Sequence, residues 1–277
     1  MPSGDRQFFA LSPHRAYVLE GGGEIVAPQI AYETWGTLDA AAGNAVLVCH
    51  ALTGDAHAHG NSGPSQPTPG WWNDFIGPGQ PLDTDRYFVV CANVLGGCQG
   101  TSGPASINPT SGQRWGGDFP IVTVRDVVRS QRALAQHLGI QRWMAVVGGS
   151  MGGMQALEWA VSYPNRCGSL VIIASTAAAS AQQIAWSQVG RQSILDDPAY
   201  QGGHYYDAPL GEGPHRGLAN ARRIAMIHYR SGEEFDRRFD RHSNDPIEPF
   251  RLEHRFDIES YLDYQAEKIQ SRFDANT

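Results

Sequence analysis

The chain has 277 residues, of which 41% are hydrophobic and 18% charged, and its formal net charge is −7. This composition is typical of a globular protein with a sizeable core, and the negative charge, without any basic run, argues against nucleic acid or an anionic membrane as the main partner. No window holds the roughly 18 apolar residues of a membrane span, and the N-terminus lacks the order of a secretory signal, so we expect a cytoplasmic protein.

Short apolar segments predict the strands of one sheet. Residues 27–36 alternate between polar and apolar and predict an early antiparallel strand. The more continuous apolar runs that follow predict strands covered on both faces; they span residues 45–51, 87–94, 143–150 and 169–175.

Helical patterns lie between these runs. Residues 123–139 place their apolar side chains on one face, with a capping box from Thr123 and Asp126 at the start and Gly139 at the end. A second helix is expected after Ser150, up to Pro164. Strands that alternate with helices predict an α/β fold with a mostly parallel sheet.

From about residue 177 the sequence becomes more polar and remains helical. We therefore expect two parts: a core over residues 1–176 and a helical lid over residues 177–277. The segment 53–85 is long and rich in glycine and proline, and loops of that length are uncommon unless they are functional.

The most informative motif surrounds Ser150. Residues 148–152 read Gly-Gly-Ser-Met-Gly, which matches G-x-S-x-G between a predicted strand and a predicted helix. That context predicts that the serine is a nucleophile at a tight turn, where the nearby glycines remove side chains that would clash. The alternative is a glycine-rich connection with a capping serine, or a phosphate loop. A dinucleotide site would require G-x-G-x-x-G spacing and an acidic residue after the next strand, and both are lacking.

A serine nucleophile needs an oxyanion hole, and we predict its donors to be the backbone N–H groups of Leu52 and Met151. Near Leu52, the side chains of His50, His57, His59 and Asp55 raise the alternative of a metal site. No further clustered ligand completes such a site, so we expect no metal.

The serine also needs a base, which in this type of site follows the nucleophile on a loop after a later strand. The later histidines all lie in the helical region, and we expect none of them to be the base; they are His204, His215, His228, His242 and His254.

Six segments together resemble one family: "YETWGTL", "HALTGDAH", "GWWNDFIGPG", "YFVVCANVLGGCQGTSGP", "VVGGSMGGMQALEWA" and "GLANARRIAM". The chain from about Tyr32 onward is similar to the homoserine O-acyltransferases of the α/β-hydrolase fold, chiefly the acetyltransferases of methionine biosynthesis.

The resemblance implies a ping-pong reaction in which Ser150 takes an acetyl group from acetyl-CoA and passes it to the hydroxyl of L-homoserine. Leu52 and Met151 match the family's oxyanion positions, and Arg222 matches an arginine that holds substrate. Without the resemblance, Arg222 would equally suit an ordinary ion pair on the lid surface. The acyl-CoA is a substrate, so no cofactor is implied, and a homodimer formed through the lid is expected.

The family's triad Asp and His correspond to positions beyond Thr277, together with two further strand–helix units of the sheet. The resemblance therefore predicts a fragment that transfers no acyl group on its own. The motifs leave open a succinyl-CoA-dependent transferase acting on homoserine or serine, a serine esterase on the same scaffold, and a non-catalytic chain that binds a partner.

Overall fold

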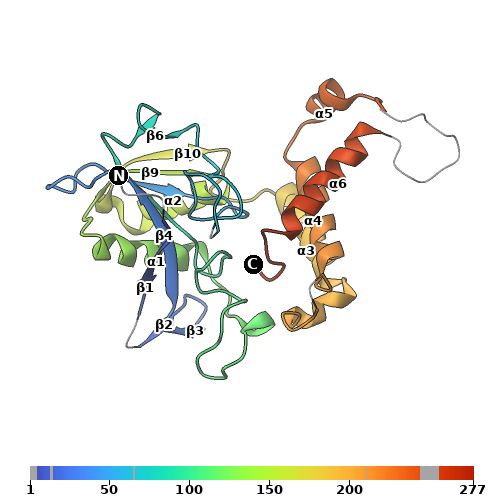
Figure 1. Cartoon of the computed structure of the whole chain (residues 1–277), viewed down its shortest axis with the longest axis horizontal. Coiled ribbons are helices and arrows are strands. Elements are labelled where there is room, and N and C mark those ends of the chain that lie inside the picture. The colour runs from blue at the N-terminus through green and yellow to red at the C-terminus, as the bar shows by residue number, and fades with distance from the viewer. Residues whose placement is uncertain (1–4, 13–14, 65, 210, 244–255) are drawn as a thin grey trace, which may run out of the picture. The chain divides into compact units, whose positions relative to one another are not determined.

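The computed structural model describes residues 5–12, 15–64, 66–209, 211–243 and 256–277 (Figure 1). The chain forms two compact units, Met1–Ala178 together with Thr277, and Ala179–Asn276. The assignment of residues 1–176 to a catalytic core and of residues 177–277 to a lid stays a prediction.

The first unit is built on a six-stranded sheet. In spatial order its strands are β1 (Gln7–Ala10), β4 (Gln29–Trp35), β8 (Phe88–Ala92), β5 (Ala45–Cys49), β9 (Trp143–Gly149) and β10 (Cys167–Ile173). The β1–β4 and β4–β8 pairs are antiparallel, and the pairs β8–β5, β5–β9 and β9–β10 are parallel. The expected early antiparallel strand and the mostly parallel sheet are thus confirmed.

Smaller elements decorate this sheet. They are the antiparallel pair β2 (Ala16–Val18) and β3 (Glu24–Val26), the parallel pair β6 (Ile76–Gly77) and β7 (Leu82–Asp83), and the 3₁₀ helices η1 (Gly116–Asp118) and η2 (Pro164–Arg166). The long loop expected over residues 53–85 therefore contains two very short strands.

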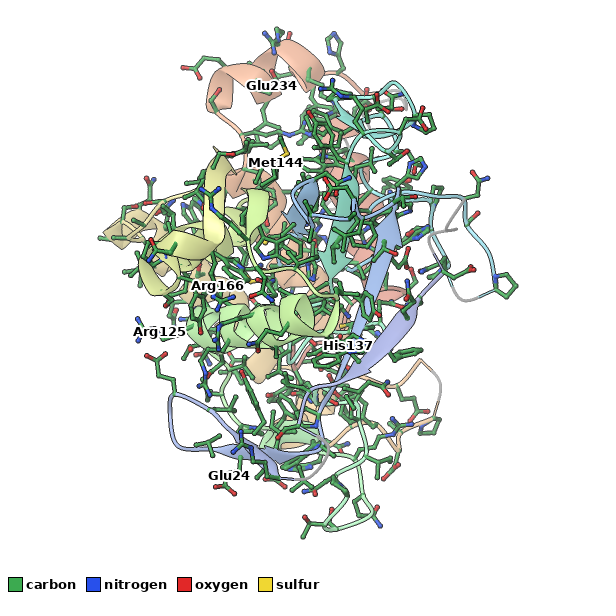
Figure 2. The ribbon with its side chains drawn as sticks, turned by 90° about the vertical axis from the view of Figure 1, so that its left-hand side faces the viewer. Glu24, Arg125, His137, Met144, Arg166 and Glu234 are labelled. Atoms are coloured by element: carbon green, nitrogen blue, oxygen red, sulfur yellow. The ribbon has the colours of Figure 1, made fainter. Side chains whose placement is uncertain are left out.

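Helix α1 (Val124–His137) begins at the predicted capping box of Thr123 and Asp126. Figure 2 labels Arg125 and His137 near its two ends. Helix α2 (Met151–Ser162) starts directly after Ser150 and packs against α1, β9 and β10. Both helices were expected from the sequence, and α2 carries the residues that follow the nucleophile motif.

The sheet is covered unevenly. Strand β5 is buried along its whole length, as expected for a strand with both faces covered. The same expectation is wrong for β10, where Val171, Ile172 and Ile173 are 45%, 39% and 41% exposed. The reason is that β10 is an edge strand: among the described residues only β9 pairs with it.

The second unit is helical. It contains α3 (Ala181–Leu195), the 3₁₀ helix η3 (Pro198–Gly203), α4 (His215–His228), α5 (Gly232–Phe239) and α6 (Asp257–Gln270). Helix α4 packs against α3 and α6. No strand follows β10 in the described part of the chain, and none of the helices described is long and apolar enough to cross a membrane.

Candidate active site

Ser150 lies at the turn between β9 and α2 with φ 54° and ψ −124°. A positive φ is uncommon for a residue with a side chain and costs energy unless its surroundings fix it. Here the Ser150 N–H donates to the Ile173 carbonyl at 3.0 Å, and the Ser150 carbonyl accepts from Gly153 N–H at 2.9 Å and Ser175 Oγ at 2.7 Å. These bonds hold the strained turn and leave the serine exposed, as a nucleophile requires.

The glycines around Ser150 are explained by close backbone approaches. A Cβ on Gly148 would overlap the Gly152 carbonyl, and one on Gly152 would overlap the Cys49 carbonyl at the end of β5. A Cβ on Gly153 would lie 2.5 Å from Ser175 Cβ. The prediction is wrong for Gly149, where a Cβ would meet only an ordinary contact of 3.6 Å.

The two predicted oxyanion donors lie on neighbouring segments. Leu52 follows β5 and Met151 begins α2, after strands that pair in parallel with Cys49 opposite Gly148. The Met151 N–H belongs to the first turn of a helix, so it has no acceptor within the helix. Among the described residues, neither N–H donates to another acceptor. Both are therefore free to bind an oxyanion, although their role stays a prediction.

His50 is buried and holds the loop that contains Leu52. The Val94 N–H donates to His50 Nε2 at 3.1 Å, so the ring proton must be on Nδ1, which lies 2.7 Å from the Ala51 carbonyl. Burial lowers the pKa of His50 more than its hydrogen bonds raise it. A neutral ring with both nitrogens occupied cannot also bind a metal.

This burial predicts a pH dependence of stability. Because the pKa of His50 is lowered in the folded chain, the unfolded chain binds a proton there more readily, and stability falls as pH decreases from about 6.5. The slope attributable to His50 cannot exceed about 1.4 kcal/mol per pH unit, the limit for one proton. Urea unfolding of wild type and His50→Asn between pH 5 and 8 measures it. Parallel curves for the two proteins would contradict the assignment.

His57 forms a separate buried pair. Its Nδ1 lies 2.8 Å from Glu33 Oε2, and the other Glu33 oxygen accepts from Gln66. Burial raises the pKa of Glu33. Burial alone would lower the pKa of His57, but the hydrogen bond and negative charge of Glu33, together with the charge of Asp55, raise it overall. In the described part of the chain no three His, Cys, Asp or Glu side chains gather to hold a metal. The absence of a metal from the reaction stays a prediction.

Arg222 lies on α4, and its side chain is half-buried. Among described residues its Nε is buried without an acceptor and no carboxylate lies within 4 Å. The adjacent Arg223 instead donates to Asp263 at 2.6 and 3.0 Å. An ion pair within this helical unit is thus observed for Arg223, and the role of Arg222 in binding substrate stays a prediction.

The later histidines lie in the second unit. His204 follows η3, His215 and His228 stand at the ends of α4, and the Nδ1 of His242 lies 2.7 Å from the Phe239 carbonyl. His254 lies outside the described residues. That none of them is the base stays a prediction, as does the position of the triad Asp and His beyond Thr277.

The sequence reasoning missed a buried polar chain beneath the nucleophile. Gln131 on α1 and Gln155 on α2 are each 1% exposed and are joined by a hydrogen bond of 2.7 Å. The available signal was the position of Gln155 among the apolar residues of α2, because a glutamine on a buried face needs a partner.

Comparisons with known proteins agree with this geometry. A family model for the alpha/beta hydrolase fold matches residues 44–276. A homoserine O-acetyltransferase of Clavibacter michiganensis is 54% identical over the whole chain, which spans 70% of that relative's length.

Solved structures of related proteins superpose on this chain. The homoserine O-acetyltransferase of Bacillus anthracis superposes with a TM-score of 0.87 at 31% identity, covering 100% of this chain and 74% of that one. Esterase E22 superposes with a TM-score of 0.85 at 30% identity, covering 98% of this chain and 75% of its own. The family model and the identity to these relatives show that the chain belongs to the homoserine O-acetyltransferase family of the alpha/beta hydrolase fold.

Proposed function

We propose that this protein transfers an acetyl group from acetyl-CoA to the hydroxyl of L-homoserine, a step of methionine biosynthesis. The observation that carries the proposal is the exposed Ser150 at a strained turn; the Leu52 and Met151 N–H groups, on the segments that follow β5 and β9, donate to no acceptor among the described residues. The identity of donor and acceptor follows from the names of the relatives.

Two displacements complete the reaction. Ser150 Oγ attacks the thioester carbonyl, the Leu52 and Met151 N–H groups stabilise the resulting oxyanion, and the C–S bond breaks to release coenzyme A. The homoserine hydroxyl then attacks the acetyl-serine, and its oxygen keeps the acetyl group as Ser150 Oγ leaves. In the first step a base takes the Ser150 proton and gives it to the departing thiolate of coenzyme A, and in the second it takes the proton of the homoserine hydroxyl and gives it to Ser150 Oγ. The proposal includes no cofactor.

Transfer requires that homoserine reacts faster than water. A positioned acceptor can have an effective molarity of about 10⁵ M or more, which exceeds the concentration of water. A free guanidinium such as that of Arg222 can hold the homoserine carboxylate by two parallel hydrogen bonds.

The test is a competition assay with the full-length protein. Acetyl-CoA or succinyl-CoA is supplied with homoserine, serine or no acceptor, and the products are separated by mass. We expect O-acetylhomoserine to form much faster than free acetate. Free acetate as the main product would support the hydrolase alternative, for which the similarity to esterase E22 is the specific observation. Succinyl products would support the succinyltransferase.

Arg222 provides a prediction with a matched control. Replacement by Lys should raise the KM for homoserine about 10- to 100-fold, because a point charge cannot reproduce two parallel bonds worth about 1–3 kcal/mol. The KM for acetyl-CoA should not change. The control Arg223→Lys alters the neighbour that already pairs with Asp263 and should mainly lower stability. If both KM values rise together in Arg222→Lys, the arginine does not bind homoserine.

We also propose that the protein acts in the cytoplasm as a homodimer formed through its helical unit. Apolar side chains on α3 support an interface there, because Ile184, Val189 and Leu195 are 55%, 47% and 54% exposed. Sedimentation of wild type and Ile184→Glu would test it, and a monomeric wild type would contradict it.

A further inference from the structure

We propose that His50 and Gln155 are positioning residues that together fix the oxyanion hole: the His50 ring sets the direction of the Leu52 N–H, and Gln155 ties its loop to the helix that begins with Met151. The inference rests on the proposed function in that Ser150 is the nucleophile and that the Leu52 and Met151 N–H groups form the oxyanion hole.

The His50 ring acts through the peptide between Ala51 and Leu52. In a planar trans peptide the C=O and N–H groups point in opposite directions, so fixing the Ala51 carbonyl also fixes the Leu52 N–H. That carbonyl accepts from His50 Nδ1 at 2.7 Å and from Gly54 N–H at 2.9 Å. On the opposite side of the ring, His50 Nε2 accepts a hydrogen bond from the Val94 N–H at 3.1 Å. The peptide plane is therefore held on its carbonyl side, and the opposite side is left for the oxyanion.

Gln155 joins the two halves of the hole. Its Nε2 donates to the His50 carbonyl at 3.2 Å and to the Met151 carbonyl at 3.4 Å. The Gln155 side chain thus bonds both to His50, two residues before Leu52, and to Met151, whose N–H is the second oxyanion donor. The close approach of Gly152 to the Cys49 carbonyl brings the same two segments together.

Hydrogen bonds fix the orientation of the side-chain amides of Gln131 and Gln155. The Trp159 indole N–H is a donor only, and it lies 2.8 Å from Gln131 Oε1. Gln131 Nε2 must then donate to Gln155 Oε1 at 2.7 Å, which turns Gln155 Nε2 toward the His50 carbonyl. The side chains of His50, Gln131, Gln155 and Trp159 are each 1% exposed, so bulk water does not compete for these hydrogen bonds. The oxyanion loop is thereby linked to the rigid packing of α1 and α2.

The two nitrogens of His50 can be separated by substitution. Asparagine places an amide N–H near the position of Nδ1, whereas glutamine places its polar atoms near Nε2. We expect His50→Gln to lower the rate of Ser150 acylation by 4-nitrophenyl acetate about 30- to 100-fold, because small displacements of a catalytic group cost that much. His50→Asn should stay within about fivefold of wild type, since it keeps the bond to Ala51. Affinity for the ester should be unchanged in both.

Two further variants separate positioning from stability. Gln155→Met keeps the side-chain length but removes the bond to the His50 carbonyl, so it should also slow acylation. Ser130→Ala removes a buried hydrogen bond on α1, from Ser130 Oγ to the Val127 carbonyl at 2.7 Å, that takes no part in this series of bonds; it should lower the melting temperature but leave acylation within about twofold. The infrared stretch of the acyl carbonyl on Ser150 provides a direct readout, because weaker hydrogen bonds from the hole raise its frequency. We expect that rise in His50→Gln and Gln155→Met only.

The outcomes are distinct. Slow acylation in His50→Gln with rescue in His50→Asn supports the inference, whether the acetyl group then passes to homoserine or to water. Transfer to water alone would overturn only the proposed function. Equal rates in the Asn and Gln variants, or an unchanged carbonyl stretch in His50→Gln and Gln155→Met, would overturn the inference.

Discussion

Replacing Ser150 by alanine should remove acetyl transfer almost completely while leaving the fold intact. The hydroxyl is exposed, and the bonds that hold the turn are made by the Ser150 backbone, so alanine can keep the same conformation. Loss of an enzyme's nucleophile commonly lowers kcat by about 10⁴-fold or more, and the remaining rate comes from binding and the oxyanion hole. Steady-state assays of the full-length protein, with thermal unfolding beside them, measure both effects.

The matched control is Ser162→Ala, at the other end of the same helix. It should retain transfer within about twofold, since the half-buried Ser162 hydroxyl donates to Glu158 within the same helix and its loss has a local effect. A Ser150→Ala variant that still makes O-acetylhomoserine at the wild-type rate would show that another group carries the acetyl.

Gly152→Ala should damage both stability and activity. The new Cβ would overlap the Cys49 carbonyl and lie 3.1 Å from the His50 carbonyl, and these backbone atoms cannot move aside as a side chain could. The first turn of α2 must therefore shift away from β5, which separates the Met151 and Leu52 N–H groups. We expect a loss of about 2–4 kcal/mol in the free energy of unfolding and a fall of about 100-fold in kcat.

Gly149→Ala is the control for this effect, because its Cβ would meet only an ordinary contact at 3.6 Å. It should keep most of the activity and stability. Equal losses in the two variants would mean that the motif tolerates no added side chain at all, and that the approach of Gly152 to β5 has no special role.

The sheet, α1 and α2 could be predicted because their signals are local. Thr123 and Asp126 marked a helix start that the structure confirms, and the glycines around Ser150 marked a turn whose close contacts the structure explains. The exposure of β10 could not be predicted in the same way. An apolar run indicates a strand, but its position at the edge of the sheet depends on which strands pair.

The supporting residues of the site were also beyond local reasoning. His50 was visible as a candidate metal ligand, yet its bond to Val94, 44 residues away, arises only when β5 and β8 pair. The same holds for Gln131 and Gln155, which meet because α1 packs on α2. Arg222 and Arg223 are adjacent in sequence, and only the packing of α4 against α6 shows which one pairs with Asp263.

The most direct test of the account is to find where the acetyl group resides between the two half-reactions. The full-length protein is incubated with acetyl-CoA without acceptor, quenched, digested and analysed by peptide mass spectrometry. We expect one acetyl group on the peptide that contains Ser150, and its loss with formation of O-acetylhomoserine when homoserine is added before the quench. Product formation with no acetyl on Ser150, or with the acetyl on a different residue, would contradict the central claim.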